Sequence, residues 1–167
     1  MLPVAQAVDP ETANARPATS PLAAADAAFL TDFESLRLPA DAFSHRQHVR
    51  LAWALLRTDP AGPLGRVERG IRRFAGHHGA SAKYHATITE AWMRLVAGTL
   101  ASSPAAAGEP FDAWVHAAPE LLDAGRLRLY FSEVRLASAE ARAGWVEPDL
   151  GLTLPAIAQA LISAPSP

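Results

Sequence analysis

A chain of 167 residues, half of them hydrophobic, is long enough to fold as one domain with a buried core. Its 15 basic and 17 acidic residues leave a formal net charge of -2, which gives no general attraction to nucleic acid or to a membrane surface. The absence of cysteine excludes disulfides, thiolate metal sites and a thiol nucleophile. Much of the apolar content is alanine, and apolar and polar residues never alternate over a long run, so we expect an all-α, single-domain helical bundle.

Targeting signals are missing from the sequence pattern as well. The N-terminus has no basic region followed by an apolar stretch, and no run of about 18 apolar residues occurs. We therefore expect a cytoplasmic protein that does not contact membranes.

The first part of the chain divides into a tail and a series of helices. Residues 1–22 are rich in Ala, Pro and Thr without periodicity, and we expect them to form a disordered arm. Apolar residues at helical spacing then predict five helices, over 23–36, 44–57, 63–78, 81 or 82 to 100, and 111–116. Ser44 and Gln47 form a capping-box pattern, and Gly79 is a typical residue after a helix end.

The second part of the chain is predicted less sharply. Residues 101–109 read as a flexible linker, and 127–131 as extended or irregular structure. Residues 132–145 predict one or two short helices, and 154–162 a loosely attached last helix. The resulting organisation is a disordered arm (1–22), a helical domain (23–150) and a C-terminal tail (151–167).

Four of the six histidines fall at predicted helix ends that an antiparallel bundle would bring together. His45 and His48 begin one helix, His78 ends the next, and His85 lies in the first turn of the helix after that. On a helical wheel, His45, His48 and His85 share the apolar faces of their helices. His78 would either belong to this site or interact with the dipole at the end of its own helix.

Two neighbouring residues are expected to point away from this group of histidines. The wheel turns His77 outward at a helix C-terminus, where it would interact with the helix dipole. It also turns Glu90 to solvent, so we do not expect Glu90 to be a ligand although its spacing from His85 suggests one.

The His-x-x-His pair places two imidazoles on one helical face, where a single ion would reach both. His85 would complete a three-histidine metal site with open positions for water or substrate, and the expected metal is zinc or iron. The alternative is that these side chains are polar core residues with hydrogen-bonded rings.

Three further residues are candidates for catalysis. Tyr84 and Tyr130 are the only tyrosines, and a hydroxyl from either would donate a proton. Lys83 would attract an anionic substrate, together with the helix N-termini nearby. Packing for the tyrosines and simple solvation for the lysine are the plainer interpretations. Asp123 and Glu133 are possible carboxylate partners.

Three strings carry a resemblance: Phe43-Ser-His45-Arg-Gln-His48-Val-Arg-Leu-Ala-Trp53, Lys83-Tyr84-His85-Ala-Thr87-Ile-Thr89 and Ala141-Arg142-Ala-Gly-Trp145-Val-Glu-Pro148-Asp149-Leu150. They resemble a group of small, uncharacterised bacterial proteins over about residues 29–150. The resemblance implies a single domain and no particular reaction.

These observations predict a small metal-dependent enzyme that acts on a polar or anionic small molecule through His45, His48 and His85. A metal-free lyase or isomerase that uses histidine acid–base catalysis is the second interpretation. A non-catalytic helical binding module is the third.

Overall fold

A computed structural model describes residues 21–59, 62–102 and 108–155. Every regular element in these ranges is an α-helix or a 3₁₀ helix, and the helices pack around one core, so the prediction of an all-α, single-domain bundle is confirmed. The predicted N-terminal arm lies outside the described residues except for residues 21 and 22. The predicted helix over 154–162 lies outside them from residue 156 onward.

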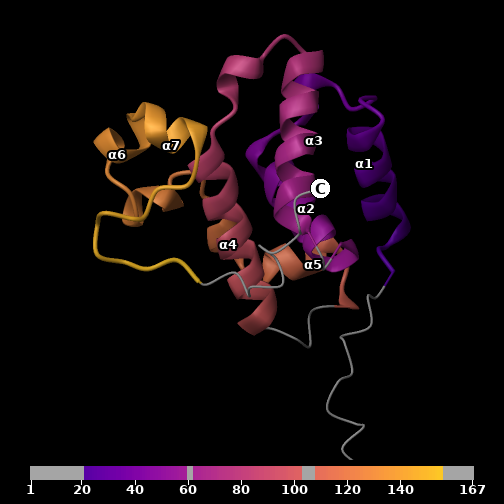
Figure 1. Cartoon of the computed structure of the whole chain (residues 1–167). Coiled ribbons are helices and arrows are strands. Elements are labelled where there is room, and N and C mark those ends of the chain that lie inside the picture. Colours follow the sequence, from indigo (N-terminus) through magenta and orange to yellow (C-terminus); the bar gives the residue numbers. More distant parts are fainter. Residues whose placement is uncertain (1–20, 60–61, 103–107, 156–167) are drawn as a thin grey trace, which may run out of the picture.

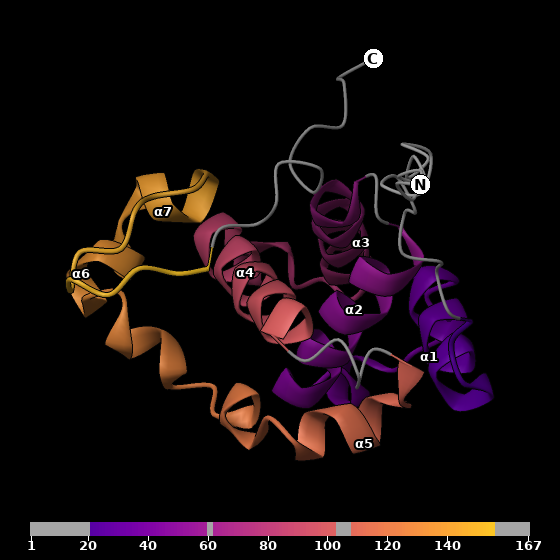
Figure 2. The same cartoon turned by 90° about the horizontal axis from the view of Figure 1, so that it is seen from below.

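Four helices make up the main body of the fold (Figures 1 and 2). They are α1 (Ala24–Glu34), α2 (His45–Thr58), α3 (Pro63–His77) and α4 (Ala86–Ser102). α2 packs against both α3 and α4, while α1 covers the outer side of α2 and α3. The first three agree closely with predicted helices. α4 begins later than predicted, because residues 81–83 form a separate 3₁₀ helix.

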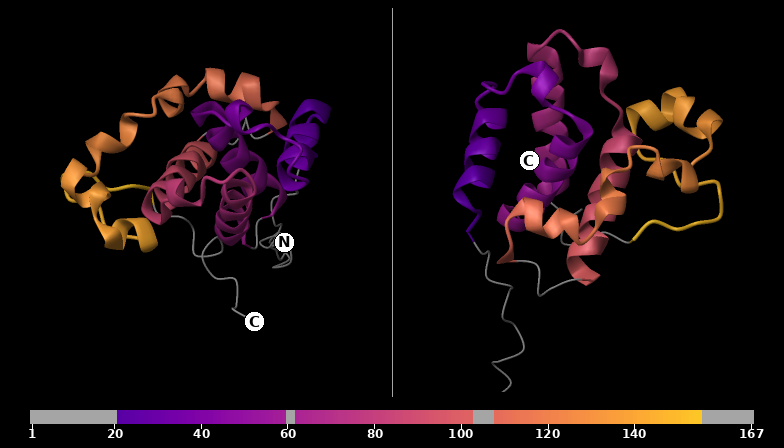
Figure 3. Two further views of the ribbon diagram at one scale, coloured as in Figure 1. Left: turned by 90° about the horizontal axis from the view of Figure 1, so that it is seen from above. Right: turned by 180° about the vertical axis from the view of Figure 1, so that it is seen from behind.

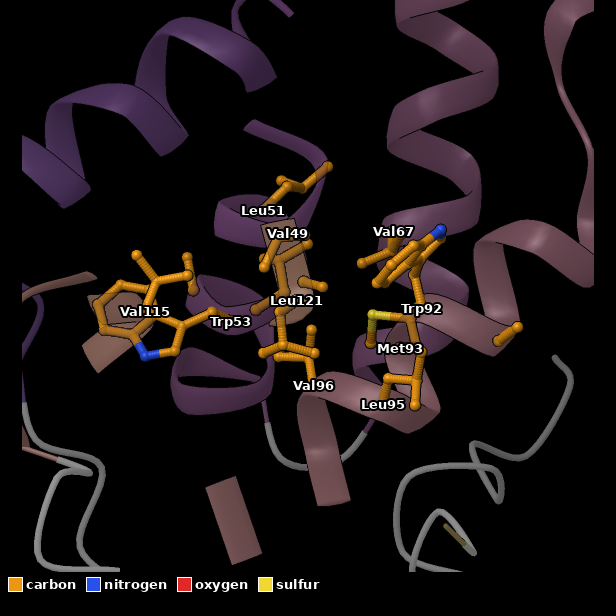
Figure 4. Close-up of a cluster of buried hydrophobic side chains, with 14 of the residues drawn as sticks. Val49, Leu51, Trp53, Val67, Trp92, Met93, Leu95, Val96, Val115 and Leu121 are labelled. Atoms are coloured by element: carbon orange, nitrogen blue, oxygen red, sulfur yellow. The ribbon is translucent and has the colours of Figure 1, made fainter. Parts of the chain in front are cut away.

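The core forms where the apolar faces of these helices meet α5 (Phe111–His116) and η5 (Pro119–Leu122). Leu51 and Trp53 of α2 are fully buried, and Val96 of α4 and Val115 of α5 pack into the same cluster (Figure 4). Trp53 also meets Trp114, with ring centroids 6.3 Å apart. Burial of these large side chains supplies the main stabilisation of the bundle.

Of the two predicted capping patterns, one is confirmed and one is wrong. Gly79 follows α3 with a φ of 66°, and the N–H of Ala80 donates to the carbonyl of Ala75 over 2.7 Å, as a Schellman motif requires. Ser44 does precede α2, but its hydroxyl makes no capping bond, and Gln47 Oε1 is buried without a partner among the described residues.

The chain after α5 turns outward along α4 through η6 (Arg126–Leu129), α6 (Glu133–Ala137) and α7 (Ala139–Ala143) (Figure 3). The expected extended or irregular stretch over 127–131 therefore begins as a 3₁₀ helix. Two short helices follow, as predicted, and the Ser132 and Ser138 hydroxyls cap them by accepting bonds from the third residue on. We call residues 132–149 the α6–α7 segment.

The two remaining short elements connect the main helices. They are η2 (Ala40–Ala42), which leads into α2, and η3 (Ser81–Lys83), which leads from α3 toward α4. None of the helices in the described ranges is both long and apolar enough to cross a lipid bilayer.

Candidate small-molecule pocket

A pocket of about 340 Å³ opens between α2, α3 and the first turns of α4. This volume is at the lower end of the range for small-molecule sites. Most of its lining is apolar, and Val67 of α3 lies near Trp92 and Met93 of α4 (Figure 4). Five of the residues singled out from the sequence also line it: His45, His48, Lys83, Tyr84 and His85.

Two histidines from one face of α2 form what we call the α2 wall of the pocket, together with Ala52. The Nε2 atom of His45 lies 2.9 Å from the carbonyl oxygen of Leu121, and Nδ1 of His48 lies 2.9 Å from the carbonyl oxygen of Ser44. A carbonyl only accepts, so each of these ring nitrogens carries a proton. In the neutral rings, Nδ1 of His45 and Nε2 of His48 are left as acceptors, and neither has a partner within the described residues.

Aromatic neighbours hold both rings of the α2 wall in place. His45 lies against Trp92 with ring centroids 4.5 Å apart, and His48 lies against Phe43 at 3.9 Å. Burial lowers the pKa of the His48 imidazole, the Ser44 carbonyl partly opposes this effect, and the nearby His45 imidazole lowers the pKa further. His48 is therefore neutral at neutral pH.

His85 differs from the α2 histidines because both of its ring nitrogens are bonded to the backbone. Nε2 donates to the carbonyl oxygen of Leu136 over 2.8 Å, and Nδ1 accepts from the N–H of Ile88 over 3.3 Å. The second bond makes His85 the N-cap of α4, and the residue is buried, with 8% exposure. His85 is thus a structural residue of the pocket as it stands in this structure.

Lys83, Tyr84 and His85 form what we call the loop wall. Lys83 is exposed at the pocket edge. The Tyr84 hydroxyl donates to Glu68 over 3.4 Å, and the Arg72 guanidinium stacks 3.8 Å from the Tyr84 ring centroid. Burial and the charge of Glu68 raise the pKa of Tyr84, so its hydroxyl stays protonated at neutral pH.

Several sequence candidates lie elsewhere. Tyr130 is buried, and its carbonyl accepts from the N–H groups of Asp149 and Leu150, away from the pocket lining. The ring of His78 lies 3.3 Å from the carbonyl of Leu38 and packs on Phe74. Neither residue lines the pocket. His78 lies outside it because α3 presents its middle to the pocket and not its end.

Three carboxylates also differ from their expected roles or places. Asp123 accepts from the N–H of Gly125, and Glu133 is exposed, and neither lines the pocket. The expectation that Glu90 points to solvent is wrong. Its side chain is only 13% exposed and pairs with Arg94 over 2.6 Å, while Arg94 stacks on Trp145.

The positions of the donor atoms bear on the predicted three-histidine metal site. Within residues 21–59, 62–102 and 108–155, no three histidine or acidic side chains are arranged so that they could hold one metal ion. His85 would have to give up two backbone bonds to become a ligand. His45 and His48 keep one acceptor nitrogen each, so the residues present fit a metal centre poorly.

The groups that fix the rings of His45 and His85 are not predicted from the sequence. The carbonyls of Leu121 and Leu136 lie 76 and 51 residues from the histidines that they bind. Backbone carbonyls carry no sequence signal, so periodicity gives the direction of a side chain but not its hydrogen-bond partners. Glu68, by contrast, is a polar residue near the apolar face of α3 and could have been singled out.

Comparison of the chain with models of protein families, with curated proteins and with solved structures finds no match.

Proposed function

We propose that this pocket binds a small, largely apolar molecule with one anionic group, and that His48 acts on it as a general base. The observation that carries the proposal is the pair of carbonyl-fixed imidazoles in the α2 wall. Each has one nitrogen occupied by the protein and the other without a protein partner among the described residues. This is how proteins fix the tautomer of a histidine that accepts a proton.

The proposed step is a proton transfer within a metal-free lyase or isomerase. Nε2 of His48 takes a proton from the bound molecule, which leaves an imidazolium and the conjugate base of the substrate. The proton then returns from Nε2 to another atom of the product. Nδ1 of His45 accepts a hydrogen bond that orients the substrate, and Lys83 at the pocket edge attracts its anionic group.

Burial supports the role of His48 in two ways. The lowered pKa keeps the ring neutral and ready to accept a proton at neutral pH. The apolar lining, which includes Val67 and Met93, lowers the polarity around His48 and so favours the neutral form of its ring. Tyr84 and Tyr130 are not proton donors in this proposal, because Tyr84 already donates to Glu68 and Tyr130 does not line the pocket.

Proton exchange in deuterated water tests the proposal across a range of candidate substrates. The protein is incubated with a panel of small hydroxy, oxo and unsaturated carboxylic acids, and loss of carbon-bound protons is followed by NMR. We expect exchange with at least one compound, loss of exchange in His48→Gln and full exchange in His77→Gln. His77 is the matched control because it is exposed and lies outside the pocket lining.

Other outcomes would overturn the assignment in distinct ways. Binding without exchange would indicate a binding module, and equal exchange in His48→Gln would remove His48 as the base. Elemental analysis of untagged protein, after exposure to zinc and ferrous ions, addresses the metal-dependent alternative. Stoichiometric metal that is lost in both His48→Gln and His85→Gln would favour that alternative over acid–base catalysis.

A further inference from the structure

Hydrogen bonds between residues far apart in the sequence connect the loop wall and the first turn of α4 to the α6–α7 segment. His85 donates to the carbonyl of Leu136. The Thr87 hydroxyl, fully buried, donates to the carbonyl of Gly144 over 2.6 Å and accepts from the N–H of Val146 over 3.1 Å. The α6–α7 segment itself contributes no residue to the pocket lining.

Arg142 of α7 makes the most direct of these connections. Its Nη1 atom donates to the carbonyl oxygen of Ala82 over 3.0 Å and to that of Tyr84 over 3.2 Å. These carbonyls stand on either side of Lys83, so one charged group fixes the backbone before and after the lysine. Bonds from a charged donor are stronger than those between neutral groups.

Hydrogen bonds and a buried side chain fix the α6–α7 segment in the position from which Arg142 reaches the carbonyls of Ala82 and Tyr84. Ser138 caps α7 by accepting from the N–H of Ala141, and the Ala141 side chain is fully buried. The two ends of the segment meet where Asp149 accepts from the Ser132 hydroxyl over 2.6 Å and from the Ser132 N–H over 2.8 Å. These bonds join its ends into a closed loop beside α4, as Figures 1 and 2 also indicate.

We propose that Arg142 is a positioning residue of the pocket, which sets the backbone of residues 82–84 so that Lys83 and Tyr84 line it. The consequence for ligand binding rests on the proposed function, whereas the geometric part does not. Arg142 does not itself line the pocket, and its effect passes through the two carbonyls. The α6–α7 segment therefore lies outside the pocket but determines the shape of its loop wall.

Arg142→Ala tests this role, with Arg142→Lys as the conservative variant. The matched control is Arg128→Ala, since Arg128 is an exposed arginine whose side chain makes no hydrogen bond or ion pair within the described residues. The readout is the ring resonance of Tyr84 in protein with ¹³C-labelled tyrosine. The chain has two tyrosines, so Tyr84→Phe assigns the signal.

We expect Arg142→Ala to move the Tyr84 resonance toward that of an exposed tyrosine, because the ring leaves the Arg72 guanidinium. Affinity for a panel acid that the parent binds should fall roughly tenfold or more. Arg142→Lys should restore part of both effects, and Arg128→Ala should change neither. If the parent binds no acid, the proposed function fails, and the Tyr84 resonance still decides the positioning role.

An unchanged Tyr84 resonance in Arg142→Ala would overturn the proposal. A shift as large in Arg128→Ala would overturn it too, because the effect would then not be specific to this guanidinium. Loss of the cooperative unfolding transition in Arg142→Ala would assign the residue to the stability of the whole fold, and the proposal would fail on that result as well.

Discussion

The α2 wall and the loop wall border the same pocket, yet their backbones are fixed by different interactions. His45 and His48 lie on a helix of 14 residues whose own hydrogen bonds and apolar face set their direction. Lys83 ends η3, and Tyr84 and His85 connect it to α4. Arg142 of the α6–α7 segment donates to the carbonyls on either side of Lys83, and the His85 ring donates to the carbonyl of Leu136 in the same segment. The backbone of the α2 wall is therefore set by local sequence, whereas the backbone of the loop wall also depends on tertiary contacts.

The largest effect that separates the walls is expected from Thr87→Val. The substitution removes a buried hydroxyl that serves both Gly144 and Val146 and leaves two backbone groups without partners. We expect the free energy of unfolding to fall by about 2–4 kcal/mol, measured by chemical denaturation. The Tyr84 resonance should shift as well, because the α6–α7 segment loses a contact with α4.

Thr99→Val is the control for this prediction. The Thr99 hydroxyl donates to the carbonyl of Leu95 within α4, and that carbonyl keeps its helical hydrogen bond after the substitution. The free energy of unfolding should therefore change by only about 0.5 kcal/mol. Equal losses in the two variants would mean that the bonds between Thr87 and the α6–α7 segment add nothing.

The next effect concerns His85. His85→Ala removes the N-cap of α4 and the donor to the Leu136 carbonyl, so we expect a loss of about 1–3 kcal/mol in unfolding free energy. His85→Asn can still accept from the Ile88 N–H and should recover part of that loss. A variant His85→Ala with parental stability would contradict the structural role and reopen the possibility that this ring serves as a ligand.

The two walls also differ in how well the sequence predicts them. Apolar spacing locates α1 to α4 and turns His45, His48 and His85 inward, because a helix of regular period fixes side-chain direction. It does not predict that His85 caps α4 or that His78 lies outside the pocket. Those features depend on which helix segment faces which, and a wheel drawn for each helix separately carries no such information.

Glu90 illustrates the same limit on a single residue. The wheel places it opposite the buried stripe of α4, which is correct for the core shared with α2 and α3. The α6–α7 segment packs on α4 over that opposite face, where Arg94 pairs with Glu90 and stacks on Trp145. Periodicity predicts the direction of a side chain relative to its own helix, but not whether a later segment will pack over it.

A smaller effect is therefore expected from Glu90→Ala. Its loss leaves Arg94, whose side chain is 17% exposed, without its ion-pair partner. We expect a decrease of about 1 kcal/mol in unfolding free energy, more than an exposed pair gives, because both side chains are largely buried. Comparison of Glu90→Ala, Arg94→Ala and the double variant should return a coupling energy of similar size, whereas additive losses would mean that the pair contributes nothing.

The smallest effect is a pH dependence that belongs to the α2 wall. Burial lowers the pKa of His48 below 6.5, so between its folded pKa and 6.5 the unfolded chain binds a proton that the folded chain does not. The stability from neutral His48 is complete above pH 6.5 and is lost as the pH falls through the folded pKa. The free energy of unfolding, measured at about pH 8 and about pH 5, should decrease more on acidification in the parent than in His48→Gln.

His77→Gln, which changes an exposed ring, is the control, and its free energy of unfolding should decrease on acidification as much as that of the parent. If the parent and His48→Gln lose stability equally on acidification, the His48 ring is not held neutral by the pocket, and the basis for its role as a proton acceptor disappears.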